Sequence, residues 1–446
     1  MPLGACLAYT GFEGTVPFLH GSQGCATYIR RYLISHFSEP MDIASSSVGE
    51  AATVFGGEAN LRTGVANVTR VYKPRMIGLA STCLTETIGE DVQSMIGRLR
   101  DPVEGLEAGT GIAVPELVFA PTPSYAGTHA DGYHAAVAAT VRALAEGTAS
   151  DPAASTIASV NLFPGILSTA DLRHLREIAD GFGLPHALIP DYSDRLAGVT
   201  VARYEKLPAG GTTAAELAAS GRATASVTLG GLVTPGVDLA GDVLAARHDV
   251  PHRRLPMPVG IRLTDQFTDL LAELSGKPAP EWLAKERGRL VDAYIDGHKY
   301  AADRTAIVFG DEDLVVGLTS FLAEIGVTPL LVASGGRSGR LASEIGRLNP
   351  NLAGTIEVLD DGDFAEIEAR AAELKPDLLV GHSKGYPTSR RLDIPLVRVG
   401  LPIHDRVGAQ RLRHVGYRGT QDLFDRVVNA LIERRQDSSD VGYAYM

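Results

Sequence analysis

Short apolar runs alternate with amphipathic stretches along much of the chain. In residues 156–191 a β-branched run and a loop precede an amphipathic segment, and a second apolar run follows it. Apolar residues of that segment recur at Leu172, Leu175 and Ile178, a spacing that predicts a helix with one buried face. Residues 304–336 repeat this form. We therefore expect a strand, a helix and a second strand in each of these segments.

Two further segments extend the pattern. Residues 74–99 have the form strand, loop, helix, and residues 364–385 combine a helix with a following strand. Strands that alternate with helices form parallel sheets covered by helices on both faces. The sequence therefore predicts an α/β fold.

The domain organisation follows from length and local composition. At 446 residues the chain exceeds one ordinary core, and a prior of about 150 residues per domain indicates about three Rossmann-like domains. Small polar residues at 146–155 suggest a linker, and residues 282–304 suggest one long helix that leads into the last domain. The predicted domains are therefore 1–150, 151–300 and 301–446.

Composition excludes several classes of protein. The formal charge of −12 gives no basic surface for a nucleic acid. The chain has no basic amphipathic run for a membrane surface, no stretch of about 18 apolar residues that could span a membrane, and no cationic segment typical of a secretory signal. We expect a cytoplasmic protein that binds neither nucleic acid nor membrane.

The three cysteines are Cys6, Cys25 and Cys83. An odd number of cysteines in a cytoplasmic chain argues against a disulfide framework. Three interpretations stay open for each of them: a buried thiol that packs in the core, a reactive nucleophile, or a ligand for a soft metal.

Cys25 and Cys83 share a local setting. Cys83 lies in an expected turn between the strand Ile77–Ser81 and a helix from Thr85, at the edge of a parallel sheet where functional loops gather. Residues 21–24 form a tight turn before Cys25, and a helix is expected from about Ala26. A thiol near a helix N-terminus has a lowered pKa and suits a metal ligand. Two cysteines in this setting favour the metal-ligand interpretation over packing.

Other motifs are weak. The chain has no CxxC or HExxH pattern, which argues against a structural zinc site. The acidic residues 311–313 follow an expected strand and would repel a pyrophosphate, so dinucleotide binding is disfavoured. Gly381–Gly385 has the spacing of a nucleophile elbow, but Pro387 follows at once and the sequence shows no Asp–His pairing for a hydrolase.

Longer motifs in the first domain carry a specific resemblance. The domain contains, in order, PLGACLAYTGFEGTVPFLHGSQGC, RRYLISHFSEP, ASSSVGEAATVFGG and STCLTETIGEDV. This order resembles the nitrogenase component 1 family on its β side, which comprises nitrogenase β subunits and NifN-type scaffolds. The resemblance extends through PMPVGIRLTDQF and RTAIVFGDEDLVVG to GYRGTQDLFDRVVNALIERR, and so covers the whole chain.

The resemblance implies a set of cluster ligands. Cys25 and Cys83 match the family cysteines that bind an iron–sulfur cluster between two unlike subunits, and Gly24 belongs to the same loop. A further family cysteine stands two residues before the proline that matches Pro2, outside this chain. Cys6 is a candidate substitute, although packing in the expected N-terminal helix is the favoured interpretation.

Residues around these cysteines have simpler explanations. Glycines allow close approach of the backbone to a cluster or a partner chain, at Gly21, Gly24, Gly56 and Gly57. We expect His20 and His36 to be hydrogen-bonded structural histidines. We expect Glu86, Glu90 and Asp91 to lie in the first turn of the helix after Cys83, where carboxylates stabilise the positive helix end.

The resemblance also implies partners and a role. The chain would be the β-type half of an α2β2 heterotetramer with an α-type subunit, and an ATP-dependent iron protein would dock on it. The shared cluster would be P-cluster-like, either 8Fe-7S or 4Fe-4S, and would relay electrons to a FeMo-type cofactor in the partner. The chain itself would contain no catalytic residue.

Two alternatives to a nitrogenase β subunit stay open. The chain could be a NifN-type scaffold that builds a cofactor, or it could belong to a nitrogenase-like reductase that cleaves carbon–sulfur bonds in methylthio-alkanes. An unrelated α/β enzyme with free cysteines is disfavoured by the paired motifs.

Overall fold

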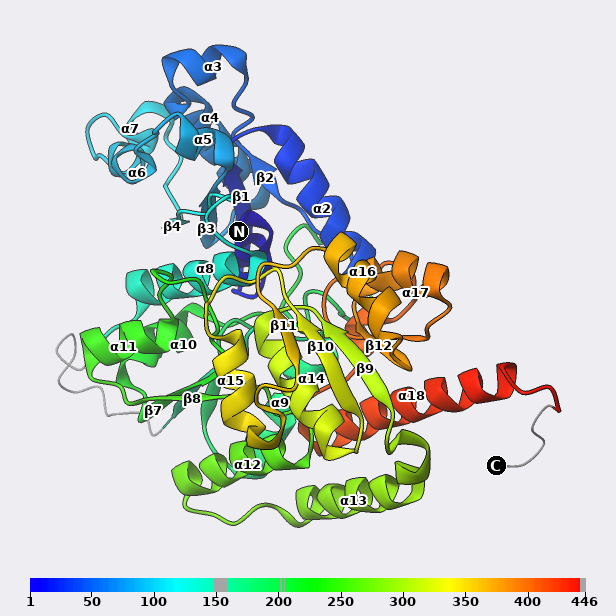
Figure 1. Cartoon of the computed structure of the whole chain (residues 1–446). Coiled ribbons are helices and arrows are strands. Elements are labelled where there is room, and N and C mark those ends of the chain that lie inside the picture. The colour runs from blue at the N-terminus through cyan, green and yellow to red at the C-terminus, as the bar shows by residue number, and fades with distance from the viewer. Residues whose placement is uncertain (148–158, 201–202, 204, 442–446) are drawn as a thin grey trace. The chain divides into compact units, whose positions relative to one another are not determined.

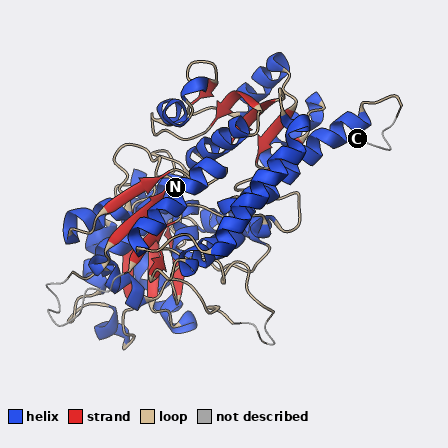
Figure 2. Cartoon of the chain, turned by 90° about the horizontal axis from the view of Figure 1, so that it is seen from below, coloured by secondary structure: helices blue, strands red, loops and turns tan. Residues whose placement is uncertain are grey.

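The computed structural model describes residues 1–147, 159–200, 203 and 205–441. The chain forms two compact units. The first contains Met1–Leu172 and Pro185–Arg253, and the second contains Arg173–Leu184 and Arg254–Met446. Figure 1 labels the elements of both units, and Figure 2 colours helices and strands separately. Among the described residues, no helix has the length and apolar character needed to cross a membrane.

The first sheet lies in the first unit and has the strand order β2-β1-β3-β4, with every pair parallel. Its strands are β1 (Thr15–His20), β2 (Ala44–Ser45), β3 (Met76–Ser81) and β4 (Glu116–Ala120). Its helices are α1 (Pro2–Thr10), α2 (Gln23–Phe37), α3 (Glu50–Phe55), α4 (Glu58–Tyr72), α5 (Cys83–Thr87), α6 (Val92–Leu99), α7 (Leu106–Thr110) and α8 (His129–Leu144). The register pairs Thr15 with Met76 and His20 with Ser81, so β1 and β3 end side by side.

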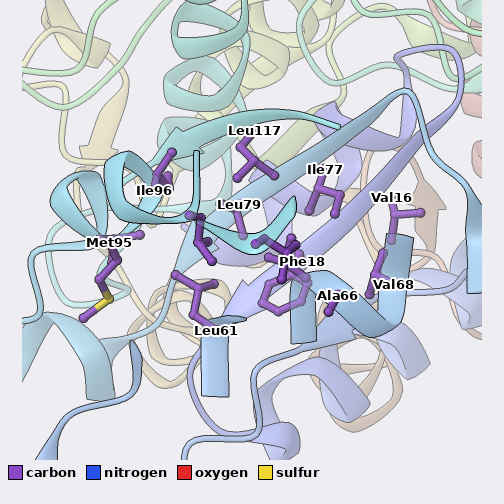
Figure 3. Close-up of a cluster of buried hydrophobic side chains, with 14 residues drawn as sticks. Val16, Phe18, Leu61, Ala66, Val68, Ile77, Leu79, Met95, Ile96 and Leu117 are labelled. Carbon is purple, nitrogen blue, oxygen red and sulfur yellow. The ribbon is translucent and has the colours of Figure 1, made fainter. Parts of the chain in front are cut away.

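Apolar side chains hold α4 and α6 against this sheet. Figure 3 shows Phe18 and Leu79 from the strands among side chains of the two helices, including Leu61 and Ile96. β1 and β3 are buried along their whole length, and apolar residues make up most of both strands. This core fixes the strand ends from which the two cysteine loops leave.

The second sheet has the order β6-β5-β7-β8, and β5 pairs in parallel with both β6 and β7. Its strands are β5 (Val160–Phe163), β6 (His186–Leu188), β7 (Ala225–Leu229) and β8 (His252–Leu255). The associated helices are α9 (Thr169–Gly181), α10 (Ala214–Ala219), η2 (Ser220–Arg222) and α11 (Ala240–His248). The strand–helix–strand form expected in residues 156–191 is confirmed. Most of the linker expected at 146–155 lies outside the described residues.

The third sheet lies in the second unit and has the order β11-β10-β9-β12-β13, again parallel. Its strands are β9 (Thr305–Phe309), β10 (Thr328–Ala333), β11 (Glu357–Leu359), β12 (Leu378–Gly381) and β13 (Leu396–Arg398). The helices are α12 (Ile261–Ser275), α13 (Glu281–Ala301), α14 (Glu312–Glu324), α15 (Leu341–Leu348), η3 (Pro350–Leu352), α16 (Phe364–Leu374), η4 (Ser383–Gly385), α17 (Tyr386–Leu392), η5 (Ala409–Arg411) and α18 (Gly416–Asp437).

The predicted α/β class is confirmed, with three parallel sheets accompanied by helices. The long helix expected at 282–304 is α13. Each of the three sheets lies within one of the three predicted domains. The contacts between residues, however, divide the chain into two compact units and not three. The division at residues 150 and 300 stays a prediction.

Candidate functional site

The two candidate ligands leave the sheet from neighbouring strands. β1 ends at His20 and leads into α2, which carries Cys25. β3 ends at Ser81 and leads into α5, which begins at Cys83. Because His20 and Ser81 are register partners, the two cysteine loops start from adjacent points at the carboxyl edge of the sheet.

Cys25 lies in the first turn of α2 and is exposed. The helix begins at Gln23, three residues earlier than expected from the sequence. Ser22 is its N-cap, and its hydroxyl oxygen accepts a hydrogen bond from the Gly24 N–H at 3.3 Å. A serine cap replaces the expected longer turn, so Cys25 lies inside the helix.

Cys83 is the first residue of α5 and is partly exposed. Here too the helix starts earlier than expected, because Thr82 and Thr85 form a capping box. The backbone N–H of Ser124 donates a hydrogen bond to the Cys83 sulfur at 3.3 Å. The Tyr125 N–H adds a second interaction with this sulfur. These donors come from the loop that follows β4.

The two thiols have opposite pKa shifts. Partial burial acts to raise the pKa of Cys83, but hydrogen bonds from Ser124 and Tyr125 outweigh burial and hold this pKa below its usual value. Partial burial raises the pKa of Cys25, and the negative charge of the Cys83 thiolate raises it further. The lowered pKa expected for a cysteine at a helix N-terminus is thus found for Cys83 and is wrong for Cys25.

The glycines near the cysteines differ in how much space a side chain at each position would have. A Cβ on Gly21, which has φ +155, would lie 2.0 Å from the Thr82 hydroxyl oxygen, so Gly21 permits the close approach of the two cysteine loops. A Cβ on Gly57 would lie 2.8 Å from a carboxylate oxygen of Glu90. A Cβ on Gly24 would meet only Ser22 at 3.7 Å. Contacts within this chain therefore do not require glycine at position 24.

His20 is a buried, hydrogen-bonded histidine, as expected. Its Nδ1 lies 2.9 Å from the Ser46 hydroxyl oxygen, and its Nε2 bonds to the Glu90 carboxylate. Burial lowers the pKa of His20, and the Glu90 carboxylate opposes this shift. His36 is also buried, and its ring packs edge-on against Phe37.

The single explanation offered for the three carboxylates after Cys83 is wrong for two of them. Glu86 lies in α5 and accepts a hydrogen bond from Ser81. Glu90 lies beyond the end of α5 and binds His20. Asp91 caps the next helix, α6, where it accepts a hydrogen bond from the Ser94 N–H at 3.0 Å. The error arose because α5 stops at Thr87.

Cys6 lies fully buried in α1, and its burial raises the pKa of its thiol. These observations favour packing over ligation.

The Gly381–Gly385 segment is also unlike a nucleophile elbow, because Ser383 bonds to the Asp405 carboxylate. Elsewhere in the second unit, Glu312 is buried and accepts a hydrogen bond from Ser338 at 2.5 Å.

Sequence reasoning missed the role of Ser124. The signal was present in the APTPS run after β4, because β4 is the strand beside β3 and its loop must emerge next to Cys83. Within the part of the chain that the structure describes, no three His, Cys, Asp or Glu side chains gather into a metal-binding group. The two thiols nevertheless fit an iron–sulfur group, since both are accessible and both lie in the first turn of a helix.

The fold and this site define an α/β protein with a pair of thiols at the carboxyl edge of a parallel sheet. Residues 1–432 match the family described as nitrogenase component 1 type oxidoreductase, and the chain belongs to this family.

Similar proteins include both β chains and a cofactor-assembly protein. The nitrogenase molybdenum-iron protein beta chain of Clostridium pasteurianum is 33% identical over 438 residues, which cover 97% of this chain and 92% of that protein. The nitrogenase iron-molybdenum cofactor biosynthesis protein NifN of Bradyrhizobium diazoefficiens is 32% identical over 441 residues, which cover 98% of this chain and 89% of that protein. A solved structure described as nitrogenase Cp1 at pH 6.5 has a TM-score of 0.93 and 31% identity, and the match covers 100% of this chain and 95% of that one.

Proposed function

We propose that this chain is the β-type subunit of a nitrogenase-like component 1 complex and that Cys25 and Cys83 hold part of an iron–sulfur cluster. The observation that carries the proposal is that two accessible thiols follow the ends of adjacent parallel strands, on loops joined by the hydrogen bond from the Thr82 N–H to the His20 carbonyl oxygen. Cysteine thiolates are the usual ligands of iron–sulfur clusters. The cluster would be P-cluster-like, either 8Fe-7S or 4Fe-4S, and shared with a partner subunit.

The residues of this chain would hold and tune the cluster, which when bound would supply reversible one-electron storage. Cys25 and Cys83 act as thiolate ligands, and Gly24 leaves open space beside Cys25. The Ser124 N–H keeps its hydrogen bond to the Cys83 sulfur, which favours the charged thiolate. The chain acts as an electron relay, and no residue of it reacts with the substrate.

The partners would be an α-type subunit, in an α2β2 heterotetramer, and an ATP-dependent iron protein. The FeMo-type cofactor would lie in the α-type subunit. Support comes from the family and from relatives that are nitrogenase molybdenum-iron protein beta chains. Exposed aromatic side chains on the elements around the cysteines also suit an interface, at Tyr28 (73% exposed), Phe55 (88%) and Tyr125 (60%).

A NifN-type assembly scaffold is the second candidate function. The observation that favours it is the near equality of the two identities, 32% to a NifN protein and 33% to a nitrogenase β chain. A scaffold would use the same two cysteines but would donate a cofactor instead of turning over a substrate. For a catalytic complex, the β-chain relatives favour dinitrogen as substrate over the carbon–sulfur bond of a methylthio-alkane.

Reconstitution separates these functions. The chain is purified anaerobically with its α-type partner and supplied with iron protein, ATP and one substrate at a time: dinitrogen, protons or a methylthio-alkane. Sustained ATP-dependent product formation, beyond one equivalent per complex, supports the catalytic function and identifies the substrate. Absence of turnover in a fully metallated complex, together with activation of an apo-protein by cofactor transfer, supports the scaffold.

A further inference from the structure

A buried histidine–glutamate pair lies beside the two cysteine loops. His20 is the last residue of β1, and its side chain is fully buried. Glu90 follows α5, and its side chain is 5% exposed. His20 Nε2 bonds to one carboxylate oxygen of Glu90, so the pair joins the strand that leads to Cys25 with the segment that follows Cys83.

The other polar atoms of this pair bind two further segments. The second carboxylate oxygen of Glu90 accepts the N–H of Gly57, at the joint between α3 and α4. His20 Nδ1 lies 2.9 Å from the Ser46 hydroxyl oxygen, which also accepts the Gly21 N–H at 2.9 Å. Each polar atom of the two side chains therefore has a partner.

The backbone of His20 ties the cysteine loops together directly. Its carbonyl oxygen accepts the Thr82 N–H at 3.1 Å and the Thr85 hydroxyl at 2.9 Å. Thr82 precedes Cys83 and caps its helix, whereas Gly21, on the other side, begins the turn to Cys25. A displacement of His20 would thus move both loops.

We propose that His20 and Glu90 are a positioning pair that fixes the separation of Cys25 and Cys83 and anchors the α3–α4 joint to them. The inference rests on the proposed function for its relevance to a cluster, but the spacing of the thiols is a property of the chain alone. The pair does not touch the thiols and acts through the backbone of the two loops.

The pair requires a side chain as long as glutamate at position 90, but it does not require the negative charge. The Glu90 carboxylate bridges two buried donors, the His20 Nε2–H and the Gly57 N–H. A glutamine has the same length, and its oxygen can accept from Gly57 while its amide group donates to His20. For this, the His20 proton moves to Nδ1 and is donated to Ser46, whose oxygen lies within reach. An aspartate keeps the charge but is one methylene too short to bridge both donors.

The test is the rate at which dibromobimane, a short bifunctional thiol reagent, joins Cys25 to Cys83 in the metal-free full-length chain purified with its partner. Cys6 is buried and does not compete. We expect Glu90→Gln to crosslink within about twofold of wild type and Glu90→Asp to crosslink about tenfold more slowly, because one charged hydrogen bond is lost. Asp91→Ala is the matched control, since it removes a neighbouring carboxylate that caps α6 and does not touch His20.

Circular dichroism confirms that each variant is folded, and single-thiol labelling at Cys25 checks that the reactivity of this thiol is unchanged. In the metal-loaded complex, Glu90→Asp should also change the line shape of the reduced-state EPR signal, whereas Glu90→Gln should not. Any crosslinking pattern other than a near-normal Glu90→Gln with a slow Glu90→Asp overturns the inference, including a slow Asp91→Ala. A wild-type complex that binds no iron refutes the proposed function instead, and leaves the crosslinking comparison valid.

Discussion

The backbone N–H of Ser124 points at the sulfur of Cys83, with 3.3 Å between nitrogen and sulfur. The donor lies 41 residues further along the chain and comes from the loop of the neighbouring strand β4. The parallel arrangement thus brings three loops to one edge of the sheet: the two that carry Cys25 and Cys83, and the one that supplies donors to Cys83. Most substitutions at position 124 would keep the backbone N–H. The contact with Cys83 therefore depends on the fold more than on the identity of residue 124.

Gly21 and Gly24 should respond differently to alanine. At Gly21 the positive φ and a contact of 2.0 Å with Thr82 make a Cβ incompatible with the joint of the two loops. We expect Gly21→Ala to lower the free energy of unfolding by about 3 kcal/mol and to abolish iron binding.

Gly24→Ala is the control and also tests the role assigned to Gly24. Its Cβ has space and adds a helix-favouring residue, so the free energy of unfolding should stay within about 0.5 kcal/mol of wild type. If position 24 faces a cluster or a partner, iron content should fall although stability does not. Urea unfolding and iron analysis measure both quantities, and unchanged iron in Gly24→Ala would remove Gly24 from the site.

Arg195 should be essential for the first unit. Its guanidinium is buried and donates hydrogen bonds to the carbonyl oxygens of Thr10 at 2.9 Å, Phe12 at 3.1 Å and Thr15 at 3.2 Å. Burial lowers the pKa of Arg195 to about 10, which still leaves it charged at neutral pH. Arg195→Met would leave these buried carbonyl groups without their donor, and we expect a loss of about 3 kcal/mol in the free energy of unfolding.

The matched control for Arg195 is Arg142→Met. Arg142 forms an exposed ion pair with Asp238, and such pairs contribute about 0–1 kcal/mol. Denaturant titration of the two variants at one pH provides the comparison. Equal losses would show that the buried hydrogen bonds of Arg195 add nothing to the turn between α1 and β1.

Glu312 should make stability depend on pH near neutrality. Burial raises the pKa of Glu312 to about 7, the hydrogen bond from Ser338 opposes this shift, and the charges of Asp360 and Asp313 add to it. In the unfolded chain the pKa returns to about 4.5, so between these values the folded state binds more protons. The contribution of Glu312 to stability is therefore present below about pH 4.5 and is lost as pH rises through about 7.

Glu312→Gln stays neutral and keeps an oxygen that can accept from Ser338. We expect this variant to exceed wild type in the free energy of unfolding by about 1–2 kcal/mol at pH 8, because solvent screening reduces the full cost of the charge. At pH 4.5 the difference should vanish. Parallel urea titrations at the two pH values measure it, and a difference that does not depend on pH would contradict the assignment.

The sequence predicts the fold class well and the site only in part. The buried strand β5 is a short, mostly apolar run, and the helix that follows it, α9, buries the evenly spaced residues Leu172, Leu175 and Ile178, so this pattern is local. The starts of α2 and α5 were predicted late, because the caps at Ser22 and Thr82 depend on local hydrogen bonds that the apolar pattern does not reveal. Glu90 and Ser124 were misjudged or missed because their partners, His20 and Cys83, are distant in sequence and meet only through the strand order.

The cysteines themselves give the most direct test of the site. Cys25 and Cys83 are accessible thiols at adjacent strand ends, whereas Cys6 is buried within α1. Replacing either accessible thiol by alanine removes a proposed ligand without leaving a cavity in the core, so we expect most of the cluster iron to be lost while the fold persists.

Cys6→Ala has the opposite expectation. The loss of a buried sulfur should lower the free energy of unfolding by about 1 kcal/mol through the space left in the core, and iron per αβ pair should stay at the wild-type value. Iron analysis, reduced-state EPR and thermal unfolding of the three variants, purified anaerobically with the partner subunit, give the comparison. Wild-type iron and spectrum in both Cys25→Ala and Cys83→Ala would refute their assignment as ligands. Loss of iron in Cys6→Ala, with the fold intact, would instead give the buried thiol a role in the site, because packing alone does not link Cys6 to a metal.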